Sequence, residues 1–283
     1  MDELRFTFYG VRGSHPVSDK RFTKYGGNTT SLLFENGNDL FIIDSGTGII
    51  NAGDYIQKKS HIKKINIFLT HLHIDHIIGL PFFNPIYNKE MKVNIYCFKY
   101  SGFDFSDTIY SLFNRPLSPI SPKGILADLK FFNLGDEIKN PVIINKNLKL
   151  SFIKDEFHPK SGVLIYRIDF FDKKIIFATD IESKDGFFGE QKKFINNADI
   201  LIHDAQYTKS DYRSKNNPKI GYGHSTVDMA LKNASDMNVK KLYLFHYNPN
   251  YSDRKLETIL KYAKNKFINT YLSVEKKINK IRR

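Results

Sequence analysis

Residues 70–76 hold the densest group of chemically active side chains in the sequence. His71, His73, Asp75 and His76 place four possible metal ligands within six residues, directly after an apolar run. Alternate residues of an extended loop share one side, so His71 and His73 are expected to face the same way. Asp75 and His76 fall where a helix is expected to begin, and they could face a second metal. Imidazole and carboxylate groups together suit zinc, manganese or iron. The alternative is a polar loop in which Asp75 only caps the helix.

The elements that would position this motif recur along the whole chain. Short apolar runs predict strands at residues 4–9, 30–34, 39–43, 65–69, 93–97, 129–132, 148–154, 163–170, 174–178, 199–203 and 241–245. Helical spacing predicts helices at residues 51–58, 76–83, 105–113, 187–197, 225–237 and 253–278. Strands with interspersed helices favour a mixed α/β layered fold. The Pro-rich residues 114–122 are expected to form a surface loop rather than a linker, which leaves one domain over residues 1–283.

The pattern His-x-His-x-Asp-His resembles the signature of the metallo-β-lactamase superfamily. The resemblance implies a four-layer αββα sandwich and three further ligands at strand ends. His158, Asp180 and His246 follow expected strands in that order. The implied ligand sets are His71, His73 and His158 for one divalent metal, Asp75, His76 and His246 for the other, and Asp180 as the bridge. Zinc is the expected metal, and manganese and iron are the alternatives.

Other segments match narrower features of the superfamily. Asp44, after the strand at residues 39–43, has the implied role of orienting a ligand histidine, and a simple turn residue is the alternative. Residues 201–206 and 223–226 resemble the His-Glu-Ala-Thr and Gly-His-Ser/Thr segments of ribonuclease Z. Carried over, His224 protonates the leaving oxygen and Asp204 orients it, although Asp204 stands where Glu is more usual. With Asp75, these two complete the expected catalytic residues. The alternative for His224 is a residue at a helix start.

The choice of substrate rests on further resemblances and on departures from them. Residues 10–16 and 25–29 resemble a subgroup of small-molecule phosphodiesterases, which includes phage enzymes that destroy cyclic pyrimidine nucleotides. No long Gly- and Pro-rich arm like that of ribonuclease Z occurs between His76 and His158. A single cysteine, Cys97, cannot build the extra Cys-bound zinc of a related phosphonate-pathway phosphodiesterase.

The resulting expectation is a two-metal phosphodiesterase for small cyclic phosphodiesters, above all cyclic nucleotides, with cyclic pyrimidine signals included. Attack by a metal-bridging hydroxide on phosphorus is the implied chemistry. A ribonuclease Z-like RNA 3′-processing endonuclease is the first alternative. Other metallohydrolases, such as a thioesterase or lactonase, and a non-enzymatic sensor on the same fold are the remaining ones.

Composition adds to the picture of partners and location. The 283 residues carry 43 Lys and Arg against 30 Asp and Glu, a net charge of +13 that favours an anionic partner. Residues 254–283 alone carry +8, and a basic amphipathic helix is expected over about 253–283. One cysteine and no long apolar run favour a cytoplasmic protein without a membrane partner. A homodimer is expected from the resemblance, and nucleic acid is a weaker alternative partner. Aromatic residues among basic ones at 110–115 and 207–222 could stack a base.

Overall fold

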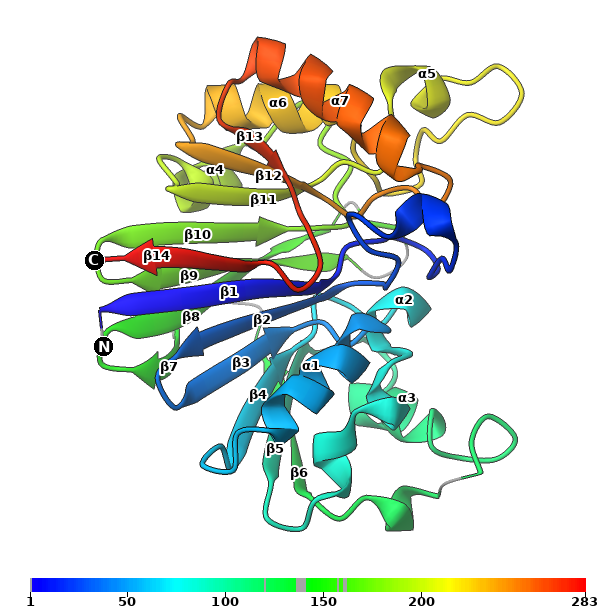
Figure 1. Ribbon diagram of the computed structural model, residues 1–283, viewed down its shortest axis with the longest axis vertical. Coiled ribbons are helices and arrows are strands. Elements are labelled where there is room, and N and C mark those ends of the chain that lie inside the picture. Colours follow the sequence, from blue (N-terminus) through cyan, green and yellow to red (C-terminus); the bar gives the residue numbers. More distant parts are fainter. Residues whose placement is uncertain (1, 120, 136–140, 157, 160–161) are drawn as a thin grey trace. The chain divides into compact units, whose positions relative to one another are not determined.

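The computed structural model describes residues 2–119, 121–135, 141–156, 158–159 and 162–283. The chain divides into two compact units. Unit 1 comprises residues 1–16, 28–136 and 275–282, and unit 2 comprises residues 17–27, 137–274 and 283. Each unit is built around one seven-stranded sheet (Figure 1).

The sheet of unit 1 combines antiparallel and parallel strands. In spatial order its strands are β14 (Ile278–Arg282), β1 (Glu3–Gly10), β2 (Ser31–Asn36), β3 (Asp39–Ile43), β4 (Lys64–Phe68), β5 (Lys92–Phe98) and β6 (Asp128–Leu134). Pairing is antiparallel from β14 to β3 and parallel from β3 to β6. The helices are α1 (Gly48–Gln57), α2 (Ile74–Ile77) and α3 (Phe105–Ser111), with 3-10 turns η2 (Leu80–Phe82), η3 (Asn84–Tyr87) and η4 (Pro122–Gly124). Helix α1 packs on β1 and β2, and buried Phe34 and Phe41 stack at 4.7 Å between ring centres.

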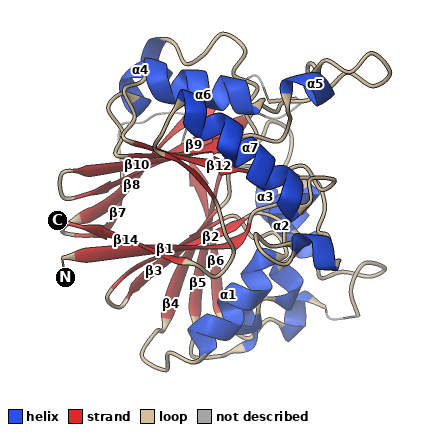
Figure 2. Cartoon of the chain, turned by 45° about the horizontal axis from the view of Figure 1, so that its top comes forward, coloured by secondary structure: helices blue, strands red, loops and turns tan. Residues whose placement is uncertain are grey.

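The sheet of unit 2 also combines antiparallel and parallel strands. Its spatial order is β13 (Thr270–Leu272), β12 (Lys241–Phe245), β11 (Ile200–Asp204), β10 (Lys173–Ala178), β9 (Val163–Phe170), β8 (Leu148–Asp155) and β7 (Val142–Asn145). Pairing is parallel from β13 to β10 and antiparallel from β10 to β7. The helices are α4 (Gly189–Ile195), α5 (Lys209–Tyr212), α6 (Val227–Asp236) and α7 (Asp253–Lys266), with the 3-10 turn η1 (Lys20–Phe22). Helix α6 lies against β11, β12 and α7 (Figure 2).

The parallel half of each sheet determines where polar side chains can gather. Carboxyl ends of neighbouring parallel strands lie at the same sheet edge, where α/β proteins bind their ligands. In unit 1 this edge receives the loops after β3 and β4, which carry Asp44 and residues 70–76. In unit 2 it receives Asp180, Asp204 and His246, at or just after the ends of β10, β11 and β12.

The mixed α/β class expected from the sequence is confirmed, and all eleven expected strands are present. The expected helix over about 253–283 is wrong beyond residue 266. Phe267 is extended, with φ −141° and ψ 99°, and the chain then forms β13 and β14 at the edges of the two sheets. Backbone pairing with β12 and with β1 outweighs the helical pattern there. The segment 76–83 is also shorter than expected, because α2 covers only Ile74–Ile77 before η2. No helix in the described part of the chain is long and apolar enough to cross a membrane.

Candidate active site

Asp44 is the buried carboxylate that organises the site of unit 1. It follows β3 directly and adopts a left-handed backbone conformation, with φ 62°. Its Oδ1 accepts the backbone N–H of Thr70 at 2.7 Å, and its Oδ2 lies 2.8 Å from Nδ1 of His76. Burial raises the pKa of Asp44, and the hydrogen bonds from His76 and Thr70 oppose that rise. Since the carboxylate accepts the Nδ1–H, His76 is left with Nε2 as its ligand nitrogen.

Thr70 orients a second histidine, His71, through its hydroxyl group. Its hydroxyl lies 3.0 Å from both oxygens of Asp44 and 3.0 Å from Nδ1 of His71. A hydroxyl has one proton, which goes to the carboxylate, so Thr70 accepts the Nδ1–H of His71. His71 therefore also presents Nε2. Its ring centre lies 4.4 Å from that of His73 and 4.3 Å from that of His76, so the three rings are gathered as the motif predicts.

The side chain of Asp75 is held by the backbone of one loop, and a second loop approaches its carbonyl oxygen closely. Its Oδ2 accepts the N–H of Ser14 at 2.7 Å and lies 3.5 Å from Nε2 of His76. A Cβ added to Gly46 would lie 2.2 Å from the carbonyl oxygen of Asp75, so that position requires glycine. The N-cap position of α2 is His73, without a side-chain cap. The alternative in which Asp75 only caps the helix is therefore wrong.

Asp180 and His246 form the corresponding pair in unit 2. Both come just after parallel strands and both have a positive φ, 54° and 58°. Nε2 of His246 lies 3.3 Å from Oδ2 of Asp180, and both side chains are buried. Left-handed conformations of non-glycine residues cost of order 1–3 kcal/mol each and cluster at functional sites. Asp44 shares this strain in unit 1, so three of the expected site residues carry it.

Asp204 is the hydrogen-bonding centre of unit 2. Its Oδ1 accepts the N–H groups of Gln206 at 3.1 Å and Ser225 at 3.0 Å. Its Oδ2 accepts the N–H of Asp180 at 3.0 Å and lies 2.8 Å from Nδ1 of His224. This carboxylate thus fixes the backbone beside Asp180 and the ring of His224 at once.

The loop that carries His224 has an anchor that the sequence did not reveal. Glu182 accepts the N–H of Gly221 at 2.8 Å and of Gly223 at 3.0 Å, and it also accepts the hydroxyl of Tyr212. Burial alone would raise the pKa of Glu182, but these donors outweigh it and lower the pKa. A Cβ on Gly223 would lie 2.5 Å from Nδ1 of His158, so the close approach requires glycine.

His158 lies beside this loop and is oriented by it. Its Nδ1 is 3.3 Å from the carbonyl oxygen of Gly223, which can only accept, so Nε2 is again the ligand nitrogen. The ring centres of His158 and His224 are 5.8 Å apart. His203 is different, because its Nδ1 contacts its neighbour's carbonyl at 2.6 Å and its Nε2 contacts Asn233 at 2.8 Å. Burial lowers the pKa of His203, which serves as a neutral structural residue.

The donor sets of both units fit divalent metals. Unit 1 contributes imidazoles and a carboxylate from residues 71–76. In unit 2, ligand atoms of Asp180, His224 and His246 all lie within 4.8 Å of one another. Orientation of an imidazole by an acceptor on its second nitrogen is the usual arrangement around bound metal. Nitrogen and oxygen ligands of this kind suit zinc, manganese or iron.

A family model described as β-lactamase superfamily domain matches residues 39–247. The chain therefore belongs to the metallo-β-lactamase superfamily, as the ligand motif indicated.

Known relatives and solved structures agree with this assignment. The chain is 26% identical to Ribonuclease Z of Picrophilus torridus, over 96% of this chain and 94% of that protein. It is 28% identical to Ribonuclease Z of Prochlorococcus marinus, over 95% of this chain and 97% of that protein. The fold matches the metallo-β-lactamase fold protein YhfI from Bacillus subtilis with TM-score 0.70 and 17% identity, over 99% of this chain and 100% of that one. It matches a diphosphatase of the PhnP family with TM-score 0.69 and 17% identity, over 99% of this chain and 97% of that one. It matches the short form of human tRNase Z with TM-score 0.63 and 18% identity, over 97% of this chain and 98% of that one.

Proposed function

We propose that this chain, a metal-dependent phosphoric diester hydrolase, uses two divalent ions. The proposed ligands are His71, His73 and His158 for one ion, Asp75, His76 and His246 for the other, and Asp180 as the bridge. Support comes from the family and from the oriented imidazoles of each unit. Zinc is the proposed metal. Bound ions of this kind lower the pKa of water and take up negative charge on the phosphoryl group.

His224 is the proposed proton donor, and its contact with Asp204 is the observation that carries the proposal. Asp204 accepts the Nδ1–H, so the second proton of the imidazolium resides on Nε2, and the neighbouring carboxylate stabilises the positive charge. A water-derived oxygen forms the new bond to phosphorus while the bond to the leaving oxygen breaks. The Nε2 proton of His224 passes to that leaving oxygen. An imidazole suits this transfer because its pKa lies near neutrality.

A small cyclic phosphodiester, and a cyclic nucleotide in particular, is the proposed substrate. Only 21 residues separate His158 from Asp180, and β9 and β10 take up most of them as an antiparallel pair. Between His76 and His158 the described residues form strands β5 to β8, helix α3 and the turns η2, η3 and η4, and the sequence there has no long Gly- and Pro-rich arm. A site without such an arm favours a small substrate, and the N-terminal resemblance favours cyclic pyrimidine nucleotides among them.

RNA is the second candidate substrate, because relatives named Ribonuclease Z align over nearly the whole chain. A substrate panel separates the two candidates. Zinc-loaded protein is incubated with 3′,5′- and 2′,3′-cyclic nucleotides and with a precursor tRNA. We expect the wild-type protein to hydrolyse a cyclic nucleotide and His71→Ala to lose this activity. The control variant His61→Ala should retain the activity, because the exposed side chain of His61 lies outside the motif. Cleavage of the precursor tRNA alone would contradict the cyclic-nucleotide proposal. A sensor role does not fit a family and relatives of hydrolytic enzymes.

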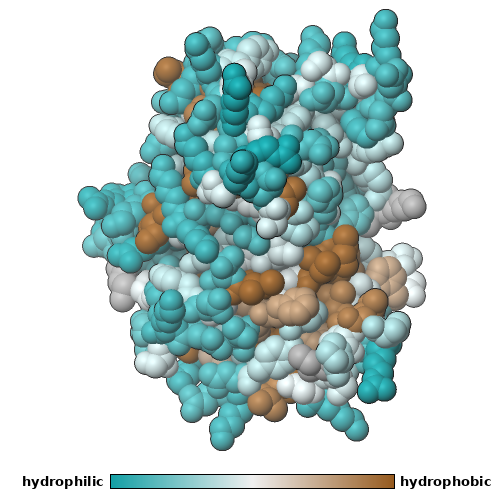
Figure 3. All heavy atoms as spheres, turned by 45° about the vertical axis from the view of Figure 1, so that its right-hand side comes forward, coloured by the Kyte–Doolittle hydropathy of each residue, from teal (hydrophilic) through white to brown (hydrophobic). Residues whose placement is uncertain are grey.

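A homodimer in the cytoplasm is the proposed working form. Ile74, Phe82, Phe103, Leu117 and Leu126 of unit 1 are between 47% and 70% exposed. Figure 3 shows exposed apolar surface gathered on one face of the molecule. Large exposed apolar patches mark association sites. Phe82→Asp is expected to lower the mass measured by light scattering from dimer to monomer, while the matched Ile268→Asp in unit 2 leaves it unchanged. A wild-type monomer would contradict the dimer.

A further inference from the structure

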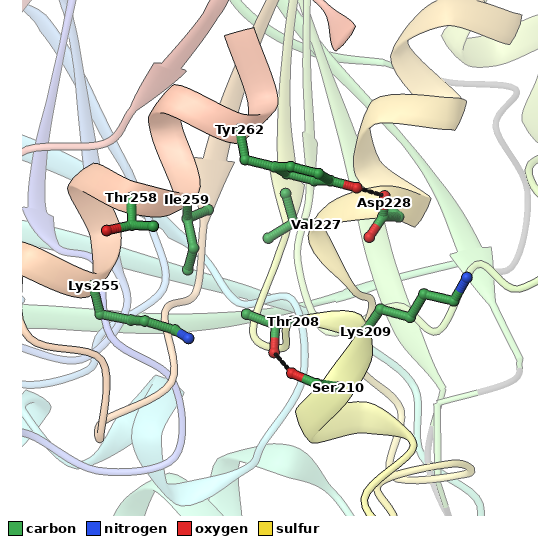
Figure 4. A pocket seen from close by; sticks show the side chains of 9 residues that line it. All are labelled: Thr208, Lys209, Ser210, Val227, Asp228, Lys255, Thr258, Ile259 and Tyr262. Carbon is green, nitrogen blue, oxygen red and sulfur yellow. Dashed lines mark hydrogen bonds between the residues drawn. The ribbon is translucent and has the colours of Figure 1, made fainter. Parts of the chain in front are cut away.

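A cavity lies within unit 2, where α5, the start of α6 and α7 meet. Its volume is about 330 Å³, and none of the residues that line it is a proposed metal ligand or proton donor. Figure 4 shows its walls: Thr208 and Ser210 on one side, and Lys255, Thr258 and Tyr262 of α7 on the other. Pockets of a few hundred Å³ hold small ligands, and this volume suits a single nucleotide.

One end of the cavity is positively charged and rich in hydroxyl groups. Lys255 points into it toward Thr208 (Figure 4), and its ammonium lies 5.6 Å from the ring centre of Tyr251. The carboxylate of Asp211 interacts electrostatically with this ammonium. Asp211 accepts the hydroxyls of Thr208, at 2.7 Å, and Tyr251. The ammonium of Lys255 is the group at this end that binds phosphate, because the hydroxyl of Thr208 already donates its proton to Asp211.

The other end of the cavity is aromatic and apolar. The ring of Tyr262 forms one wall, and Val227 and Ile259 form the floor (Figure 4). Asp228 accepts the hydroxyl of Tyr262 and, at 2.8 Å, the ammonium of Lys266, so the ring is fixed in place and the carboxylate is neutralised. Tyr262 is 44% exposed, which leaves the ring accessible for stacking. A flat aromatic surface in the same cavity as a cation suits a base joined to a phosphate.

We propose that this cavity is a second nucleotide site, which binds the phosphate at Lys255 and stacks the base on Tyr262. The ligand is a nucleoside monophosphate unit, either free or within single-stranded RNA. The cavity is also connected by backbone to the catalytic segments. Tyr207 donates its N–H to Ser225 at 3.2 Å and accepts that of Val227 at 2.9 Å. Thr208 and Val227 therefore continue the two segments that carry Asp204 and His224.

The experiment is calorimetric titration of the zinc-loaded full chain with nucleoside 5′-monophosphates and with a single-stranded RNA hexamer. Lys255→Ala and Tyr262→Ala are expected to weaken binding at least tenfold. Two matched controls are expected to change it less than threefold: Lys261→Ala, an exposed lysine on the same helix, and Tyr262→Phe, which keeps the ring. Hydrolysis of bis(p-nitrophenyl) phosphate is measured on the same samples and is expected to be unchanged in all four variants.

The two ligands distinguish the source of the nucleotide. If Lys255→Ala and Tyr262→Ala lose affinity for the free monophosphates, the site binds a small molecule. If they lose affinity only for the hexamer, the site binds RNA. Equal affinity of wild type, Lys255→Ala and Tyr262→Ala for both ligands would overturn the second site. Because binding and hydrolysis are read separately, loss of the proposed catalytic function would show in the ester assay alone.

Discussion

Nδ1 of His224 lies 2.8 Å from Oδ2 of Asp204, and the same oxygen accepts the backbone N–H of Asp180 at 3.0 Å. One buried carboxylate therefore positions both the proposed proton donor and the backbone of the proposed bridging ligand. The sequence departs here from the usual Glu of ribonuclease Z. The shorter Asp side chain nevertheless reaches the imidazole, so the departure does not break the pair.

Removal of the proton donor should depend on the leaving group. His224→Ala is expected to lower kcat for a cyclic nucleotide by about 10²–10⁴-fold, the usual contribution of general acid catalysis. The p-nitrophenolate leaving group needs no proton, so kcat for bis(p-nitrophenyl) phosphate should fall less than tenfold. Steady-state kinetics with both substrates make the comparison. Equal losses on both would show that His224 acts as a metal ligand or a structural residue instead.

Asp44 should control metal affinity through His76. Asp44→Asn keeps a residue that tolerates the left-handed backbone but weakens the acceptor for Nδ1–H. Loss of such an outer partner typically lowers metal affinity about 10–100-fold. Competition with a chromophoric zinc chelator measures this, with the exposed Asp107→Asn as the control. Wild-type affinity in Asp44→Asn would argue against orientation of His76 by Asp44.

Gly46 should be intolerant of any side chain. Gly46→Ala would place a Cβ 2.2 Å from the carbonyl oxygen of Asp75, so the loop that carries the motif must move. We expect the free energy of unfolding to fall by about 1–3 kcal/mol, as in other overpacked sites, together with weaker zinc binding. Gly135→Ala, where the Cβ meets open space, is the matched control in urea unfolding. A Gly46→Ala protein as stable as wild type would show that the loop can move without a loss in the free energy of unfolding.

Glu275 should make stability depend on pH. Burial raises its pKa to about 7, while two hydrogen bonds from Asn28, at 2.7 and 2.8 Å, partly oppose the rise. Between its ordinary value of 4.5 and about 7, the folded chain holds a proton that the unfolded chain has lost. The free energy of unfolding therefore falls as pH rises through that window, by at most about 3 kcal/mol.

Urea unfolding from pH 4.5 to 8 tests this dependence in wild type and Glu275→Gln. The glutamine does not titrate. As pH rises, the free energy of unfolding of wild type should therefore fall relative to that of Glu275→Gln. Parallel stability curves would contradict a raised pKa of Glu275.

Much of the fold and the candidate site could be predicted because the signals are local. Apolar runs correctly predicted eleven strands, and the spacing of His71, His73 and His76 predicted that these three rings gather. The match of His158, Asp180 and His246 to strand ends followed from the superfamily resemblance, and the family assignment is confirmed. Their roles as ligands stay predictions, as does the single domain.

What could not be predicted depends on contacts between distant residues. The segment after residue 266 has a helical pattern, yet the sheet edges supply pairing partners that no local signal reveals. Glu182 lies 41 residues from Gly223, and nothing in either segment marks the anchor that joins them. Asp75 looks like a helix cap in sequence, but His73 occupies the N-cap position and the Asp75 carboxylate accepts the N–H of Ser14, 61 residues away.

The most direct test is a titration of zinc into metal-free protein while the hydrolysis of bis(p-nitrophenyl) phosphate is followed. We expect no hydrolysis without metal and a rate that reaches its plateau at two zinc ions per chain. His71→Ala and His76→Ala should each bind less zinc and remain inactive at that ratio. Full activity in the metal-free protein, or two bound ions with no hydrolysis of any phosphodiester, would contradict a two-metal phosphodiesterase.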